Sequence, residues 1–201
     1  MKFSEKWHQV PRPVKLFLLR GAFLFVIWKL LYWSLLLPHR TLDAPLTRLI
    51  GAGTTVVLNG FSRPAMYWME EGLDERPKGM DGILTTEKVE RVYRGRDKLL
   101  SIADVCNGLE LMVLYAGYIL CWPGRRWRKV KFITGGWVLI IGMNMLRCAA
   151  LALIYLRWPE YLDFYHHYLF NFIVYGSIFW LWYLFTPATP QKPALNVVVH
   201  A

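Results

Sequence analysis

Long apolar segments separated by charged stretches are the main pattern along the chain. Four of them have the length of a membrane-spanning helix, at about residues 16–37, 103–122, 132–156 and 167–185. About 20 apolar residues in a helix cross the roughly 30 Å hydrocarbon core of a bilayer. The pattern therefore predicts an all-α fold, a multi-pass integral membrane helical bundle that forms one domain over residues 1–201.

Residues 123–131 carry the clearest orientation signal, because this short loop contains five basic residues and no acidic one. Lysine and arginine accumulate in cytoplasmic loops, so we expect this loop inside and the start of segment 103–122 outside. The chain before residue 16 is also basic, which places the N-terminus inside. The last apolar segment then returns inward, and the tail after residue 186 is cytoplasmic.

Residues 44–62 are less clearly a span, because apolar residues are mixed there with polar residues and three glycines. Such a segment can cross the membrane, enter and leave on one side, or lie in the interface. With both termini inside, we expect an interfacial or re-entrant helix. The polar region 63–102 is then an extracytoplasmic loop, in which residues 89–102 predict a β-hairpin around Gly95 and Arg96.

Composition and charge support a membrane protein. Hydrophobic residues make up 55% of the chain, above the usual soluble range of about 45–50%, and the mean hydropathy is +0.27. The net charge of +10 comes mostly from basic residues that flank apolar segments. It therefore indicates topology rather than a nucleic-acid-binding face. We expect membrane lipids as a partner and no nucleic acid.

The three cysteines lie within or at the edge of apolar segments, and their positions suggest no disulfide framework. Cys106 differs from the others because it opens its segment at the outer end, on the predicted first helical turn, where the helix dipole favours a thiolate. A thiolate can attack a peptide carbonyl to form a thioester, so Cys106 is a candidate nucleophile. The alternative role, a small hydrophobic residue, fits Cys121 and Cys148.

Arg147 lies about ten residues before the outer end of segment 132–156, in the outer half of the membrane. A charge at that depth is functional by default, and here it could stabilise an oxyanion. The alternative is a structural ion pair with Glu110, which lies four residues after Cys106 on the same predicted helix face. Asn144, one turn before Arg147, could orient the guanidinium or hold a substrate backbone.

His166 and His167 open the last apolar segment at the same outer level. One of them could act as general base toward the thiol and as general acid toward a leaving amine. Adjacent helical residues point about 100° apart, so only one can face the site well. Two alternatives are an interfacial pair without chemistry and a metal site. The pair lacks the usual spacing of zinc ligands, and we expect no metal and no cofactor.

The motifs around these residues resemble those of the exosortase/archaeosortase family. They read Asp-Val-Cys-Asn-Gly-Leu at 104–109, Asn-Met-Leu-Arg at 144–147, and His-Tyr-Leu-Phe-Asn-Phe-Ile-Val-Tyr-Gly at 167–176. Their order and spacing also agree with the family, and the resemblance covers roughly residues 86–186. Many members have more spans, so the chain is similar to a short exosortase variant.

The resemblance implies a sortase-like cysteine transpeptidase, a thiol protease of the bacterial or archaeal cytoplasmic membrane whose active site faces outward. It would recognise exported proteins by a C-terminal motif, a transmembrane helix and a basic tail, cleave them, and transfer them to an amine acceptor. By position, Cys106 would be the nucleophile, Arg147 the transition-state stabiliser and a histidine of the 166–167 pair the acid and base. The supporting residues would be Asn144, Glu110 and Gly108.

The chain departs from the family pattern near the cysteine and near the histidines. Asn107 stands where the family has a small residue. The residue four positions after the histidine is Asn171 if His167 is the match and Phe170 if His166 is, whereas the family has glycine there. The later glycine, Gly176, favours His167, which is preferred while both are kept.

A non-catalytic membrane protein that assists the export of surface polysaccharide or protein is the main alternative function. Such a scaffold has no need for a cysteine, an arginine and a histidine at one depth. A transporter is a further alternative, but the sequence contains no internal repeat with paired broken helices.

Overall fold

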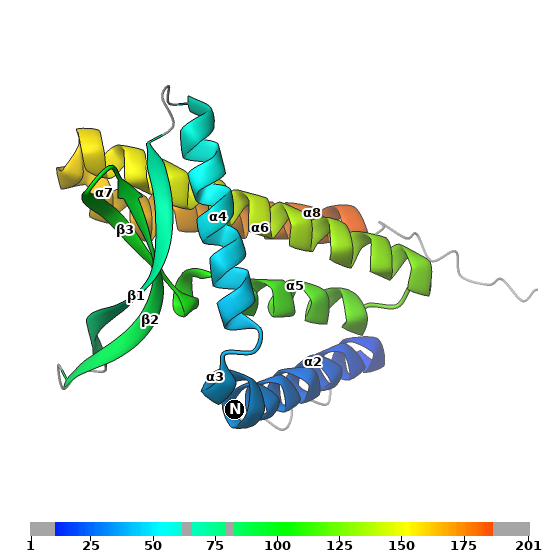
Figure 1. Cartoon of the computed structure of the whole chain (residues 1–201). Helices are drawn as coiled ribbons and strands as arrows, with labels where there is room; N and C mark the ends of the chain where they lie inside the picture. The colour runs from blue at the N-terminus through cyan, green and yellow to red at the C-terminus, as the bar shows by residue number, and fades with distance from the viewer. Residues whose placement is uncertain (1–10, 62–65, 79–82, 187–201) are drawn as a thin grey trace, which may run out of the picture.

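The computed structural model describes residues 11–61, 66–78 and 83–186. Within these residues, the chain combines a helical body with an antiparallel three-stranded sheet that lies at one end of it (Figure 1). Most of the N-terminal segment and of the C-terminal tail, both expected in the cytoplasm, lies outside the described residues.

The N-terminal part is helical and changes direction before the sheet. α2 (Arg12–Leu31) continues through the π-helical turn η1 (Tyr32–Leu36) into the short α3 (Leu37–His39). Arg40 then adopts a left-handed backbone conformation with φ of 49°, which ends this helix. Because of that turn, α4 (Asp43–Phe61) runs away from α2 and toward the sheet (Figure 1).

The sheet consists of β1 (Tyr67–Lys78), β2 (Ile83–Arg94) and β3 (Asp97–Ala103), paired antiparallel in the order β1-β2-β3. β2 and β3 meet at the predicted Gly95-Arg96 turn, where Gly95 has a φ of 62° that suits glycine. This hairpin is therefore where the sequence predicts it. The first strand, β1, is an addition that sequence reasoning missed.

The many charged residues of β1 explain why the sequence pattern does not predict this strand. Half of its residues are charged, so the alternation of apolar and polar residues that marks a strand is hidden. In the folded chain two of these charges, Glu71 and Asp74, form ion pairs across the sheet. Asp74 lies 2.7 Å from Arg91 of β2 and 3.3 Å from Lys98 of β3. Cross-strand ion pairs of this kind add to the stability of the sheet.

The rest of the chain is helical. A 3₁₀ turn, η2 (Asp104–Cys106), connects β3 to α5 (Leu109–Cys121). The next helix, α6 (Arg126–Arg157), begins inside the segment 123–131 that was expected to be a loop. The remaining elements are η3 (Pro159–Tyr161), α7 (Leu162–Phe164), the π-helical turn η4 (Tyr165–Leu169) and α8 (Phe170–Phe185).

The expectation of an all-α, multi-pass helical bundle is wrong. The fold is mixed, and among the described residues only α6 and the helical run Pro159–Phe185 are long and apolar enough to cross a membrane. α5 has 13 residues, which at 1.5 Å per residue is about 20 Å and too short for a bilayer core. The segment expected to span at 16–37 is likewise not among these helices; it contains Arg20 and Lys29 and is divided among α2, η1 and α3.

Two hydrophobic clusters hold the elements together. In the first, α4 lies between the sheet and α6, with Ile50 of α4, Val92 of β2 and Ala152 of α6 all buried. The segment expected to lie in or on the membrane interface is thus a helix that contributes to this core. In the second cluster, α5, α6 and α8 meet around the buried Tyr115, which packs so close to Gly136 that no larger residue fits there.

Candidate active site

Cys106 lies between the sheet and the helical body. It is the last residue of η2, and α5 begins only at Leu109, so the thiol is on the N-terminal side of that helix and not on its first turn as predicted. The side chain is partly exposed, unlike those of the buried Cys121 and Cys148. Gly108 makes the turn possible, because its φ of 82° is a left-handed conformation that favours glycine.

Asn144 fixes the Cys106 turn to α6. Its Nδ2 donates a hydrogen bond of 2.7 Å to the backbone oxygen of Cys106, and the Asn144 side chain is buried. A Cβ atom on Gly108 would lie 3.2 Å from this same amide nitrogen. Asn144 was expected to orient the Arg147 guanidinium or to hold a substrate backbone. Its contact is with the backbone of the cysteine turn.

A cavity of about 410 Å³ brings three of the predicted groups together. Cys106, Arg147 and His166 all line it, although they come from η2, α6 and η4. Arg147 Nη2 lies 3.5 Å from the backbone oxygen of His166, which is the outer limit for a hydrogen bond. A thiol, a guanidinium and an imidazole that line one cavity are groups that can serve as nucleophile, oxyanion stabiliser and acid–base in acyl transfer.

The two histidines have different surroundings. His166 lines the cavity, whereas His167 is not among the described residues that line it. His167 Nε2 instead lies 3.2 Å from Asp163 Oδ1, with an exposed side chain. Both belong to the π-helical turn η4, and such turns occur frequently at functional sites. The geometry therefore favours His166, whereas the motif resemblance preferred His167.

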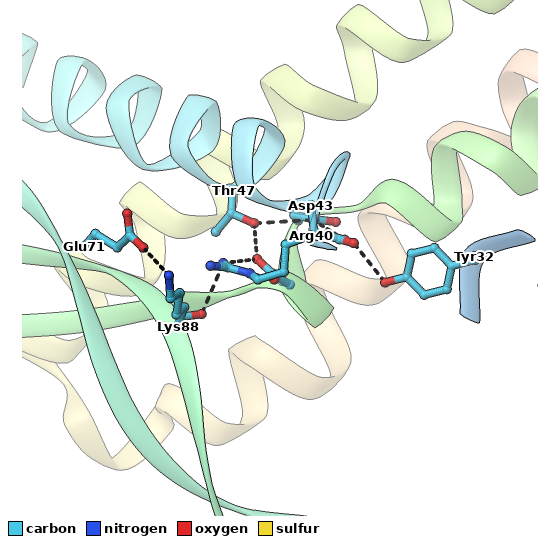
Figure 2. A network of polar contacts seen from close by, with 8 residues as sticks. Tyr32, Arg40, Asp43, Thr47, Glu71 and Lys88 are labelled. Atoms are coloured by element: carbon cyan, nitrogen blue, oxygen red, sulfur yellow. Dashed lines mark hydrogen bonds and ion pairs between the residues drawn. The ribbon is translucent and has the colours of Figure 1, made fainter. Parts of the chain in front are cut away.

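A buried polar network supports the cysteine turn from the other side (Figure 2). Arg40 makes a bidentate ion pair with Asp104, with Nε–Oδ2 and Nη2–Oδ1 distances of 2.5 and 2.8 Å. The hydrogen bonds to Asp104 raise the pKa of Arg40. Thr47 Oγ1 donates to Asp104 Oδ1 at 2.7 Å. These contacts tie η2 to the start of α4.

The same network continues through two almost completely buried residues. Asn107 Nδ2 donates to Asp43 Oδ1 at 2.9 Å, and Tyr32 donates to the other oxygen of Asp43 at 3.1 Å. Asn107 Oδ1 accepts the backbone N–H of Leu109 at 2.8 Å and so starts α5. Sequence reasoning missed these residues, because each is an ordinary polar residue in its own segment. Asn107 was noted only as a departure from the family pattern.

Glu110 does not pair with Arg147, and the ion pair expected between them is wrong. Its carboxylate lies 2.6 Å from Lys29 Nζ of α2. The expectation assumed that residues 106 and 110 share one face of a single helix. Because α5 starts at Leu109, that relation does not hold, and Glu110 points toward α2. Arg147 thus remains available to a group in the cavity.

A second, larger cavity of about 780 Å³ also borders the cysteine turn. It is also lined by Cys106, Asn144 and Arg147, and in addition by residues of the polar network and by apolar residues of α5 and α8. Cys106 therefore lines both cavities. Within residues 11–61, 66–78 and 83–186, no group of three or more His, Cys, Asp and Glu side chains is placed to hold a metal ion.

Comparison with known proteins adds no relative. A scan against protein-family models, a search of curated proteins and a search of solved structures found no match to this chain.

Proposed function

We propose that the protein is a membrane-associated cysteine transpeptidase or protease of the exosortase/archaeosortase type, which cleaves C-terminal sorting signals of exported proteins. The observation that carries the proposal is that Cys106, Arg147 and His166 line one cavity. They belong to three separate elements, and they are the residues of the three motifs that resemble the family, with His166 in place of the preferred His167. No comparison supplies a relative, so the proposal depends on these motifs and this cavity.

The proposed reaction has two halves. The Cys106 thiolate attacks the carbonyl carbon of the scissile peptide bond, and Arg147 stabilises the negative charge that develops on the carbonyl oxygen. His166 takes up the thiol proton and delivers it to the departing amine, so that the C–N bond breaks and a thioester remains. An amine or water then attacks the thioester and regenerates the thiol.

The exposed apolar surface supports a membrane location. Only 33% of the apolar window of α6 and 17% of that of the Pro159–Phe185 run are buried inside the protein. Large apolar side chains such as Val138, Phe172 and Phe179 are exposed. A water-soluble protein rarely leaves contiguous apolar surface of this extent uncovered, and lipid would cover it.

The charge of α6 supports an outward-facing site. Its first residues, Arg126 to Lys131, include four basic residues, and by the positive-inside rule this favours a cytoplasmic position for this end. Arg147 lies ten residues before the other end of the helix, about 15 Å at 1.5 Å per residue. The proposed site therefore lies in the outer half of the membrane, on the side from which an exported substrate would arrive.

The experiment that tests the function requires an exported protein from the same genome with a C-terminal motif, an apolar span and a basic end. Its size is followed in cells that contain the wild-type protein or a variant. Cys106→Ala and Arg147→Ala should leave it unprocessed while the protein remains in the membrane, and Cys121→Ala and Cys148→Ala should process it normally. Processing at the wild-type rate by Cys106→Ala would overturn the proposal and favour the accessory role in export.

A further inference from the structure

β3 is an edge strand that leads directly to the candidate nucleophile. In the described sheet it is paired with β2 on one side only, because the strand order is β1-β2-β3. Its last residue, Ala103, is followed at once by η2, which ends at Cys106. An edge strand presents backbone N–H and C=O groups to whatever lies beside it.

The free edge of β3, and not one of its faces, borders the smaller cavity. Four consecutive residues of this strand, 99–102, line the cavity. Consecutive side chains of a strand point to opposite faces of the sheet. Ile102 is buried in the cluster with α4 and α6, whereas Ser101 lies beside Asp74 and hydrogen bonds to it. Residues that point in opposite directions share only the backbone edge, so the edge is what the cavity exposes.

The opposite wall of this cavity is mainly apolar. It consists of Leu151 and Tyr155 from α6 together with Pro159 and Leu162 from the segment that follows. At about 3.3 Å per residue, the four lining residues of β3 extend over roughly 13 Å. With a volume of about 410 Å³, the cavity is of a size for a single extended chain. Arg147 and His166 border the same space as Cys106.

We propose that the substrate peptide adds to the free edge of β3 as a fourth strand and thereby brings its scissile carbonyl to Cys106. This inference rests on the proposed function, because it specifies how the substrate of that reaction binds. Backbone hydrogen bonds to the edge hold the peptide, and alternate side chains contact the apolar wall of α6. Recognition is therefore strongest for an extended segment with small or apolar residues at every second position.

The direction of the peptide follows from the position of the second cavity. That cavity is bordered by apolar residues of α5 and α8, including Leu114 and Val174, and so suits the membrane-embedded part of the substrate that follows the cleaved bond. The part before the cleaved bond then lies along β3 and ends at Cys106. Since Cys106 is at the C-terminal end of β3, this part runs parallel to the strand.

A peptide probe that reacts with cysteine tests the docking without a known substrate. The probe is acetyl-Ala-Val-Thr-Val chloromethyl ketone, applied to the full chain in lipid nanodiscs, with labelling of Cys106 followed by mass spectrometry. Its rate relative to iodoacetamide is divided by the same ratio measured with glutathione. We expect this quotient to be about ten or more. A value near one would overturn the proposal.

Methylation of one backbone nitrogen of the probe at a time tests the strand geometry. In a parallel ladder every second peptide residue gives its N–H to β3, so methylation should slow labelling about two- to tenfold at alternate positions and little at the others. Because the change is in the probe, the fold of the protein is not affected. Equal losses at all positions, or none, would contradict a β-strand pairing. A second copy of the chain paired through β3, observed as a dimer that does not react with the probe, would also contradict peptide docking at this edge.

A pair of variants on α6 provides the matched control. Leu151→Trp would fill the space beside β3, whereas Leu153 lines a different cavity and is 39% exposed. Leu151→Trp should slow peptide labelling at least fivefold without changing labelling by iodoacetamide, and Leu153→Trp should change neither. Equal effects of the two variants on the peptide would count against the docking site.

The outcomes separate this inference from the proposed function. If Cys106→Ala abolishes processing of the exported protein but N-methylation shows no alternation, the function stands and the β3 docking mode is wrong. If the alternation is observed but Cys106→Ala still processes normally, the edge binds peptides and the proposed chemistry is wrong.

Discussion

The side chain of Asn144 donates a hydrogen bond of 2.7 Å to the backbone oxygen of Cys106, one helical turn from Arg147 on α6. This contact gives the thiol and the guanidinium a common support. The Arg40–Asp104 ion pair holds the same turn against the segment between α3 and α4. The position of the candidate nucleophile is therefore determined by elements from both halves of the chain.

Replacement of Asn144 by leucine should loosen the cysteine turn. The backbone oxygen of Cys106 would lose its donor, at a cost of about 1–3 kcal/mol for a buried polar group. We expect a lower Tm in detergent and slower processing of the exported protein. Asn171→Leu is the control, because its amide makes an exposed bond of 2.9 Å to the His167 oxygen within the same helical run. If the two variants have the same Tm, Asn144 has no special role in stability.

The two histidines should behave differently. His166→Ala removes the imidazole that lines the cavity and should reduce processing by about 10²- to 10⁴-fold, the usual contribution of a general acid–base group. His167→Ala removes only the partner of Asp163 at the surface and should process at nearly the wild-type rate. Single-turnover kinetics of both variants measure this. The reverse order of effects would mean that the helix turns His167 inward when substrate binds.

The Arg40–Asp104 pair should matter more for stability than an exposed pair. Each of its side chains is less than a quarter exposed, and Asp104 also accepts a bond from Thr47. Arg40→Met should lower the free energy of unfolding by about 1.5–3 kcal/mol, since a bond to a charged group is lost. Lys88→Met breaks the 3.7 Å pair with Glu71, in which the two side chains are 58% and 42% exposed, and should cost less than about 1 kcal/mol. Denaturant unfolding of the two variants gives the comparison, and similar losses would contradict it.

The sheet should lose stability in acid through Asp74. Hydrogen bonds from Ser101, and then from Arg91 and Lys98, lower the pKa of Asp74 from 3.8 to about 2. A carboxyl whose pKa is lower in the folded state stabilises the fold fully above its unfolded value, and this contribution is lost as the pH falls from about 4 to 2. Asp74→Asn should therefore be less stable at neutral pH and show a shallower fall of Tm over that window. An unchanged slope would mean that the pairing contributes nothing.

The sequence by itself determined the local features of this protein. The apolar runs at 132–156 and 167–185 lie within α6 and the Pro159–Phe185 run, and the Gly95-Arg96 turn lies between β2 and β3. Helices follow the local apolar pattern, and a tight turn requires particular residues, so both can be read without tertiary contacts. Sequence motifs also pointed to Cys106 and Arg147.

Only the tertiary structure decided which groups meet. β1 pairs with β2 along its whole length, and its Asp74 contacts Arg91 and Lys98. A start of α5 at Leu109 turns Glu110 toward Lys29 instead of Arg147. The π-helical turn η4 selects His166 for the cavity. β1 depends on a partner strand elsewhere in the sequence, whereas the two helical cases share one physical reason. A shift of one or two residues in where a helix starts or widens rotates a side chain by 100° or more, and local sequence does not determine such a shift.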